Sequence, residues 1–167
     1  LVTRDITKNE AIVSVVAFLA LSTFFSAQLG LLSLFIFLAC MVLGITYSVP
    51  PIHLKRRMFG KQLTLGVSSA LSILVGGSAF GYFPPILIYT ILVIFPFMSI
   101  STVIADLKDV KADAAADYRT LAISLGAKRS IDLAIYGLVA IIGLVIPGVL
   151  YFNLNPGFLL IMIPLLA

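Results

Sequence analysis

Long apolar runs separated by short polar connectors make up most of the chain. A helix rises about 1.5 Å per residue, so roughly 20 apolar residues cross a hydrocarbon layer of about 30 Å. The pattern predicts an all-α fold, a polytopic bundle of transmembrane helices in a single domain over residues 1–167. Runs close to the required length cover residues 11–28, 31–49, 63–83, 86–105 and 130–152, and a partial run covers 157–167.

Composition supports this interpretation, because 61% of the residues are hydrophobic and only 11% are charged. So few charges cannot cover a surface that faces water, which excludes an ordinary soluble domain. The chain begins at Leu1, and its last apolar run is too short to cross a bilayer. We therefore expect a domain that is truncated at both ends.

Basic residues gather in three segments that the expected helices place on one side of the membrane, whereas the connectors on the other side are uncharged. The positive-inside rule then predicts that these charged loops lie in the cytoplasm. We expect an integral, multi-pass protein of the plasma membrane. The net charge of +4 suits an anionic lipid bilayer and gives no reason to expect a nucleic acid partner. The three segments contain Arg4 and Lys8; Lys55, Arg56, Arg57 and Lys61; and Lys108, Lys111, Arg119, Lys128 and Arg129.

The stretch "IADLKDVKADAAADYRTL" (104–121) holds four of the seven acidic residues: Asp106, Asp109, Asp113 and Asp117. Their spacings of three and four place them on one face if the fourth helix continues past the membrane. Stacked carboxylates repel one another unless a cation lies against them, and carboxylate oxygens together with substrate phosphates suit Mg²⁺. The alternatives are a solvated loop whose acids balance nearby bases, and a proton or cation pathway of a transporter.

The basic connector "YSVPPIHLKRRMFGK" (47–61) follows the second apolar run. Its two prolines end the helix, and Lys55, Arg56 and Arg57 follow in succession. Three adjacent cations can bind phosphate oxygens, although they can equally anchor the chain at the membrane interface. Tyr47 lies where aromatic belt residues are common, and His53 is more typical of a solvated residue than of a ligand.

Small residues are frequent in the third run, among them Gly66, Gly76, Gly77 and Ser78. Such residues let helix backbones approach closely in lipid, so we expect tight packing around this helix. A lining of an internal cavity is the alternative interpretation.

Together, "YSVPPIHLKRR" and "DLKDVKADAAADYRTLAISLG" resemble two signatures of the UbiA superfamily of intramembrane prenyltransferases. The first is similar to the YSxPPxRLKR loop of that family, and the second to its DxxDxxxD motif. The opening "LVTRDITKNEA" resembles the segment leading into the third of nine spans, so the chain would correspond to spans three to eight. His53 replaces the usual arginine, Asp117 stands where glycine is common, and the first aspartate-rich motif, NDxxDxxxD, is absent from these 167 residues.

The resemblance implies Mg²⁺-dependent transfer of a polyprenyl group from a prenyl diphosphate to an aromatic or other lipophilic acceptor. It implies that Asp106, Asp109 and Asp113 bind the metal, with Asp109, Asp113 and Tyr47 as the catalytic residues. Lys55, Arg56 and Arg119 would bind the diphosphate. Because the first motif is missing, we expect these 167 residues alone to be inactive.

Two other functional classes remain open from the sequence. A non-catalytic membrane subunit would tolerate an incomplete metal site. A cation-coupled transporter is less favoured, because the expected spans carry almost no charge near mid-membrane. Mg²⁺-dependent binding of a prenyl diphosphate would distinguish the enzyme from both. The acceptor, the prenyl chain length and the oligomeric state are not specified by the sequence.

Overall fold

The computed structural model describes residues 7–116, 118–155 and 157. This part of the chain is all-α, and five of its helices are long and apolar enough to cross a membrane, which confirms the predicted fold class. The five are α1 (Lys8–Gln28), α2 (Leu31–Ser48), α3 (Gly60–Ala79), α4 (Pro85–Ala115) and α6 (Ala127–Phe152). Two short helices join them, the 3-10 helix η1 (Leu54–Arg56) and α5 (Leu121–Leu125). The predicted partial span 157–167 lies outside the described residues except for Gly157.

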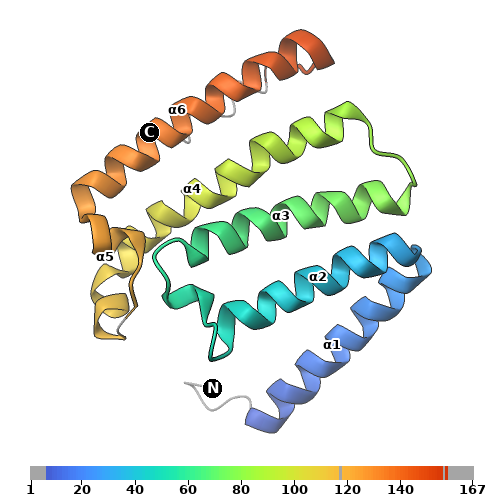
Figure 1. The fold of residues 1–167 in the computed structure, drawn as a ribbon, viewed down its shortest axis with the longest axis horizontal. Helices are drawn as coiled ribbons and strands as arrows, with labels where there is room; N and C mark the ends of the chain where they lie inside the picture. The colour runs from blue at the N-terminus through green and yellow to red at the C-terminus, as the bar shows by residue number, and fades with distance from the viewer. Residues whose placement is uncertain (1–6, 117, 156, 158–167) are drawn as a thin grey trace.

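The long helices lie side by side in chain order, each packed on the one before it and the one after it (Figure 1). Successive helices run in opposite directions, so the connectors fall alternately at the two ends of the layer. The start of α1, the η1 segment and α5 lie at one end, and the uncharged connectors lie at the other. This arrangement brings the charged segments to one end, as their spacing along the sequence predicts.

Both ends of α3 differ from the sequence prediction, and its start lies at the charged end. Helix α3 begins at Gly60, not at residue 63, so Lys61 and Gln62 belong to its first turn and not to a connector. It ends at Ala79, not at residue 83, and Gly81 adopts a left-handed φ of 62° in the turn that follows. Pro84 and Pro85 then start α4, where the missing proline N–H groups cost no helical hydrogen bond.

Helix α4 continues past residue 105 and ends at Ala115. Its 31 residues correspond to about 46 Å, which exceeds a hydrocarbon layer of about 30 Å. The last turns of α4, with their acidic residues, therefore project beyond the membrane core.

Small residues allow close contact along this layer, as predicted for the third apolar run. A Cβ on Gly77 would come within 2.6 Å of Leu87, so α3 and α4 touch there without space for a side chain. Ser33 and Ser78, both buried, share a hydrogen bond of 2.7 Å between α2 and α3. Gly76 does not take part, because nothing lies within 4 Å of a Cβ at this position.

Helix α6 packs on α4 around a buried cluster of Val93, Ile141 and Val145. The Tyr89 hydroxyl donates to the carbonyl oxygens of Leu144, at 2.8 Å, and Val145, at 3.2 Å. The outward faces carry large exposed apolar side chains, such as Phe18 at 70% and Phe80 at 88%. Such surfaces suit contact with lipid and not with water.

Candidate functional site

The acidic face predicted from the spacing lies on the projecting end of α4. Asp106, Asp109 and Asp113 all belong to this continuous helix, and they differ in exposure along it. Asp106 is fully buried, Asp109 is exposed and Asp113 is half-buried. Asp117 lies outside the described residues.

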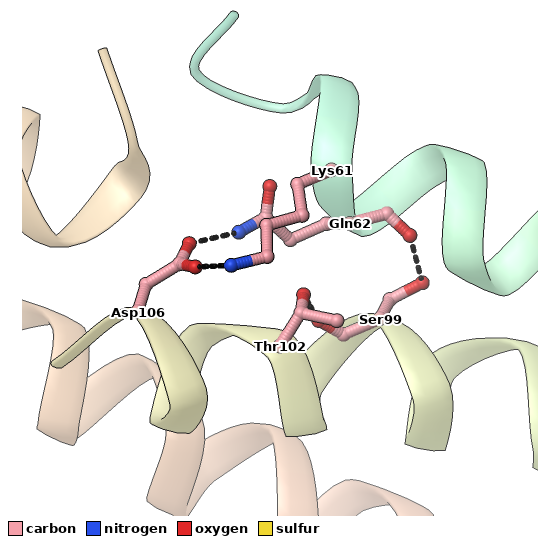
Figure 2. Close-up of polar contacts among 5 residues, drawn as sticks. All are labelled: Lys61, Gln62, Ser99, Thr102 and Asp106. Carbon is pink, nitrogen blue, oxygen red and sulfur yellow. Dashed lines mark hydrogen bonds and ion pairs between the residues drawn. The ribbon is translucent and has the colours of Figure 1, made fainter. Parts of the chain in front are cut away.

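Asp106 contacts the first turn of α3 through both carboxylate oxygens (Figure 2). Lys61 Nζ forms an ion pair with Oδ1, and Gln62 Nε2 donates to Oδ2 at 3.0 Å. The Gln62 carbonyl oxygen accepts from Ser99 Oγ at 3.1 Å, one further contact between the same two helices. Because α3 begins earlier than the sequence predicts, neither Lys61 nor Gln62 was among the predicted site residues.

The basic segment folds into η1, which contains Lys55 and Arg56. His53 precedes it in a left-handed conformation with φ of 46°, and this turns the chain into η1. Gly60 lies directly against η1, since a Cβ there would overlap the carbonyl oxygen of Leu54. An open pocket of about 370 Å³ adjoins this segment. It is lined by Pro50, Pro51, Ile52, His53, Arg56 and Arg57.

The two sequence motifs meet where the chain leaves α4. The Arg119 N–H donates to the carbonyl oxygen of Arg56 at 3.1 Å. The ring of Tyr118 lies beneath two cations, with Arg56 Cζ 5.4 Å and Lys55 Nζ 5.9 Å from its centre. The structure thus brings the predicted diphosphate-binding residues Lys55, Arg56 and Arg119 together. Tyr118 was missed by the sequence, where its only signal is an aromatic residue next to Arg119.

Tyr47 is half-buried in the last turn of α2 and lies at the same end of the layer as these residues. The structure therefore places every described member of the predicted site at the end that carries the charges.

The electrostatics at this end reflect crowding of like charges. Partial burial, together with the positive charges of Arg56 and Lys55, lowers the pKa of His53, so its imidazole is neutral at pH 7.

On the projecting end of α4, partial burial raises the pKa of Asp113. Lys61 opposes this shift, whereas Asp106 and Asp109 add to it.

The exposed end of the acidic face has the chemistry of half a divalent-cation site. Within residues 7–116, 118–155 and 157, no three His, Cys, Asp or Glu side chains are grouped to hold a metal by themselves. The single ion pair found in this part of the chain uses Asp106, which leaves Asp109 and Asp113 unpaired with cations. Mg²⁺ typically takes one or two carboxylates and completes its shell with water and substrate phosphates. Asp109 and Asp113, one turn apart, therefore fit a site that also needs a phosphate ligand.

An apolar pocket of about 260 Å³ lies between α3, α4 and α6, close to the charged end. Gln62, which binds Asp106, is one of its lining residues, as is Leu121 of α5. The other side chains that form its wall are Phe59, Leu63, Phe95, Pro96, Val103 and Leu133, together with Ser99 and Ile100.

Comparison with known proteins assigns the chain to a family. The model of the UbiA prenyltransferase family matches residues 1–167. The structure of a UbiA homolog from Archaeoglobus fulgidus bound to Cd²⁺ is similar, with a TM-score of 0.75 and 21% sequence identity. The match covers 99% of this chain and 60% of that one, and it supports the fold. No curated protein matches the chain. From the family match and its five apolar helices, the chain is a multi-pass integral membrane protein and belongs to the UbiA prenyltransferase family.

Proposed function

We propose that this protein transfers a polyprenyl group from a prenyl diphosphate to an aromatic or other lipophilic acceptor in the membrane, in a Mg²⁺-dependent reaction. The observation that carries this proposal is the junction between η1 and the segment after α4. There the Arg119 N–H binds the Arg56 carbonyl oxygen, and Tyr118 lies beneath Lys55 and Arg56. Cations for a diphosphate thus lie at the same end of the layer as the carboxylates of α4.

The division between polar and apolar surfaces suits such a substrate. The charged groups gather beyond the membrane core, where a diphosphate stays hydrated until it is bound. The apolar pocket lined by Phe59, Leu63 and Phe95 begins nearby and continues between apolar helices. We propose that the first part of the prenyl chain lies in this pocket while the diphosphate stays near η1.

Asp109 and Asp113 would hold Mg²⁺, as an exposed and a half-buried carboxylate one turn apart. The family resemblance implies that Asp106 binds the same metal. The Archaeoglobus homolog binds Cd²⁺, which supports a divalent cation in this fold. When bound, Mg²⁺ would neutralise the negative charge that develops on the leaving diphosphate.

Protein side chains would also stabilise the negative charge on the leaving diphosphate. Lys55, Arg56 and Arg119 would bind phosphate oxygens and stabilise the leaving diphosphate as the allylic C–O bond breaks. Tyr47 would donate a hydrogen bond to the diphosphate or place its ring against the allylic cation. The surrounding apolar helices would exclude water from that cation until the acceptor attacks.

We further propose that the η1 end faces the cytoplasm, on the basic charge of its connectors, and that the membrane is the plasma membrane. The family resemblance calls for the first aspartate-rich motif, NDxxDxxxD, as well, and these 167 residues lack it. We therefore propose that this chain alone is inactive, so substrate binding is measured in place of turnover.

The test is Mg²⁺-dependent binding of a radiolabelled prenyl diphosphate to the chain in lipid nanodiscs. We expect saturable binding with Mg²⁺, little binding with EDTA, and loss of binding in Asp109→Ala/Asp113→Ala. Asp132→Ala is the matched control, because Asp132 is an exposed acid on α6. Prenyl diphosphate binding that requires neither Mg²⁺ nor the α4 carboxylates would contradict the proposal and favour a non-catalytic subunit.

A further inference from the structure

Asp106 differs from the other acids of α4 in that no part of it is exposed. Both of its oxygens are engaged, Oδ1 by Lys61 and Oδ2 by Gln62 (Figure 2). Mg²⁺ requires a near-octahedral shell that usually keeps several waters. A fully buried carboxylate leaves no room for such a shell, whereas Asp109, about one turn further along α4, is exposed.

A second contact joins the same two helices at Ser99, nearer the start of α4. The Ser99 hydroxyl is shared between two carbonyl oxygens, that of Phe95 in its own helix at 2.9 Å and that of Gln62 in α3 at 3.1 Å, and Asp106 lies seven residues beyond Ser99. Seven helical residues span about 10 Å. Both contacts end on the first turn of α3, at Lys61 and Gln62, so together they restrict how far α4 can slide along this turn or rotate against it. That rotation sets the direction in which Asp109 and Asp113 project.

The first turn of α3 also contacts the basic half of the proposed site. Gly60 touches the backbone of η1 at Leu54, and Lys61 and Gln62 follow it directly. One helical turn therefore joins the segment that carries Lys55 and Arg56 to the helix that carries the acids.

We infer that Asp106 is a positioning residue: through Lys61 and Gln62 it holds α4 in the rotation that presents Asp109 and Asp113 to the metal, and it does not itself bind metal. The inference rests on the proposed function, because it concerns the Mg²⁺ half-site of that reaction. It replaces the metal-binding role that the family resemblance implies for Asp106.

The test uses Mn²⁺ as a paramagnetic substitute for Mg²⁺, titrated into the full chain in nanodiscs, with free Mn²⁺ measured by electron paramagnetic resonance. Asp106→Asn and Lys61→Met should each weaken Mn²⁺ binding by roughly 10-fold, a typical loss when a group that orients a metal ligand is removed. The Asp106→Asn/Lys61→Met double variant should bind Mn²⁺ no more weakly than the single variant with the lower affinity, because both changes break the same cluster. Lys61→Arg, which keeps the ion pair, should restore binding to within about 3-fold of the unaltered chain.

The Lys61→Met variant decides between positioning and metal ligation. If Lys61 were only a nearby charge, removing it would strengthen Mn²⁺ binding by lowering the positive potential at the carboxylates. The inference is overturned if Lys61→Met binds Mn²⁺ as tightly as the unaltered chain, or more tightly. It is likewise overturned if Asp106→Asn weakens Mn²⁺ binding while Lys61→Met does not.

Should either variant fail to fold, Gln62→Met removes one hydrogen bond and keeps the ion pair. It should weaken Mn²⁺ binding by about 3-fold, and unchanged binding counts against the inference.

Asp109→Asn separates the positioning role from the proposed metal half-site. Normal Mn²⁺ binding by Asp109→Asn refutes the proposed metal half-site and the positioning role with it. If Asp109→Asn loses Mn²⁺ binding and Lys61→Met has no effect, only the positioning role is refuted.

Discussion

The guanidinium carbon of Arg56 lies 5.4 Å from the centre of the Tyr118 ring, so residues from the two sequence motifs are in contact. Lys55 lies over the same ring at 5.9 Å. Cations over an aromatic face gain about 0.5–1 kcal/mol each when partly exposed, and the contact also limits where their side chains point. Tyr118 therefore arranges two of the cations proposed to bind the diphosphate.

Replacing Tyr118 should weaken diphosphate binding through these cations. We expect Tyr118→Leu to weaken Mg²⁺-pyrophosphate binding by about 5-fold, which corresponds to about 1 kcal/mol. Tyr118→Phe keeps the aromatic face and should bind within about 2-fold of the unaltered chain. Isothermal titration calorimetry in nanodiscs measures both constants. Equal losses in the two variants would point to the hydroxyl and not to the ring face.

Gly60 provides a test of the contact between α3 and η1. A Cβ at this position would overlap the Leu54 carbonyl oxygen, and backbone cannot yield as a flexible side chain can. Gly60→Ala should lower stability by about 2 kcal/mol and displace η1, which weakens pyrophosphate binding as well. Thermal unfolding and calorimetry provide the two measurements.

Gly44→Ala is the control for this change, because Gly44 also lies within a helix and nothing is within 4 Å of its Cβ position. Gly44→Ala gains up to about 1 kcal/mol of helix propensity inside α2, whereas Gly60 is the first residue of α3, so a loss of stability in Gly60→Ala but not in Gly44→Ala reports the contact. Indistinguishable unfolding temperatures for the two variants would show that η1 does not depend on this approach.

Ligand-induced stabilisation should report the α4 carboxylates independently of turnover. With Mg²⁺ and pyrophosphate at about 100 times the dissociation constant, binding adds about 2.7 kcal/mol, or an increase in Tm of roughly 5–10 °C. Asp109→Asn/Asp113→Asn should abolish this increase, and EDTA should abolish it in the unaltered chain. Asp132→Asn should keep it. An increase that persists in the double variant would assign the metal to other residues.

The sequence predicts the direction of the acids better than their surroundings. Spacings of three and four are enough to place Asp106, Asp109 and Asp113 on one helical face, and the structure has them on continuous α4. Which of them is covered depends on where α3 begins. Lys61 and Gln62 are polar and lower the local hydropathy, so the apolar pattern starts α3 too late and assigns them to a connector.

The contact between Tyr118 and η1 could not be predicted from the sequence either. Helix periodicity relates residues within one element, but it does not say which loops meet at the end of a layer. The charge pattern predicted only that the basic connector and the acidic segment share one end, and the structure has them there (Figure 1). The hydrogen bond from Arg119 to the Arg56 carbonyl oxygen depends on backbone positions that no side-chain pattern encodes.

His53 should make diphosphate binding depend on pH. Partial burial and the charges of Arg56 and Lys55 lower its pKa, so the free protein carries a neutral imidazole at pH 7. An anion bound in the adjoining pocket favours the protonated form, so binding takes up a proton and strengthens as the pH falls. We expect the affinity of the unaltered chain for pyrophosphate, divided by that of His53→Asn, to rise between pH 7 and pH 5.5. The ratio cancels the protonation of pyrophosphate itself and of the aspartates.

His53→Arg is the control, because its side chain stays charged throughout this pH range. It should bind pyrophosphate more tightly than His53→Asn at pH 7, and its affinity relative to His53→Asn should not rise as the pH falls. An affinity ratio that stays constant for the unaltered chain would place His53 away from the bound anion.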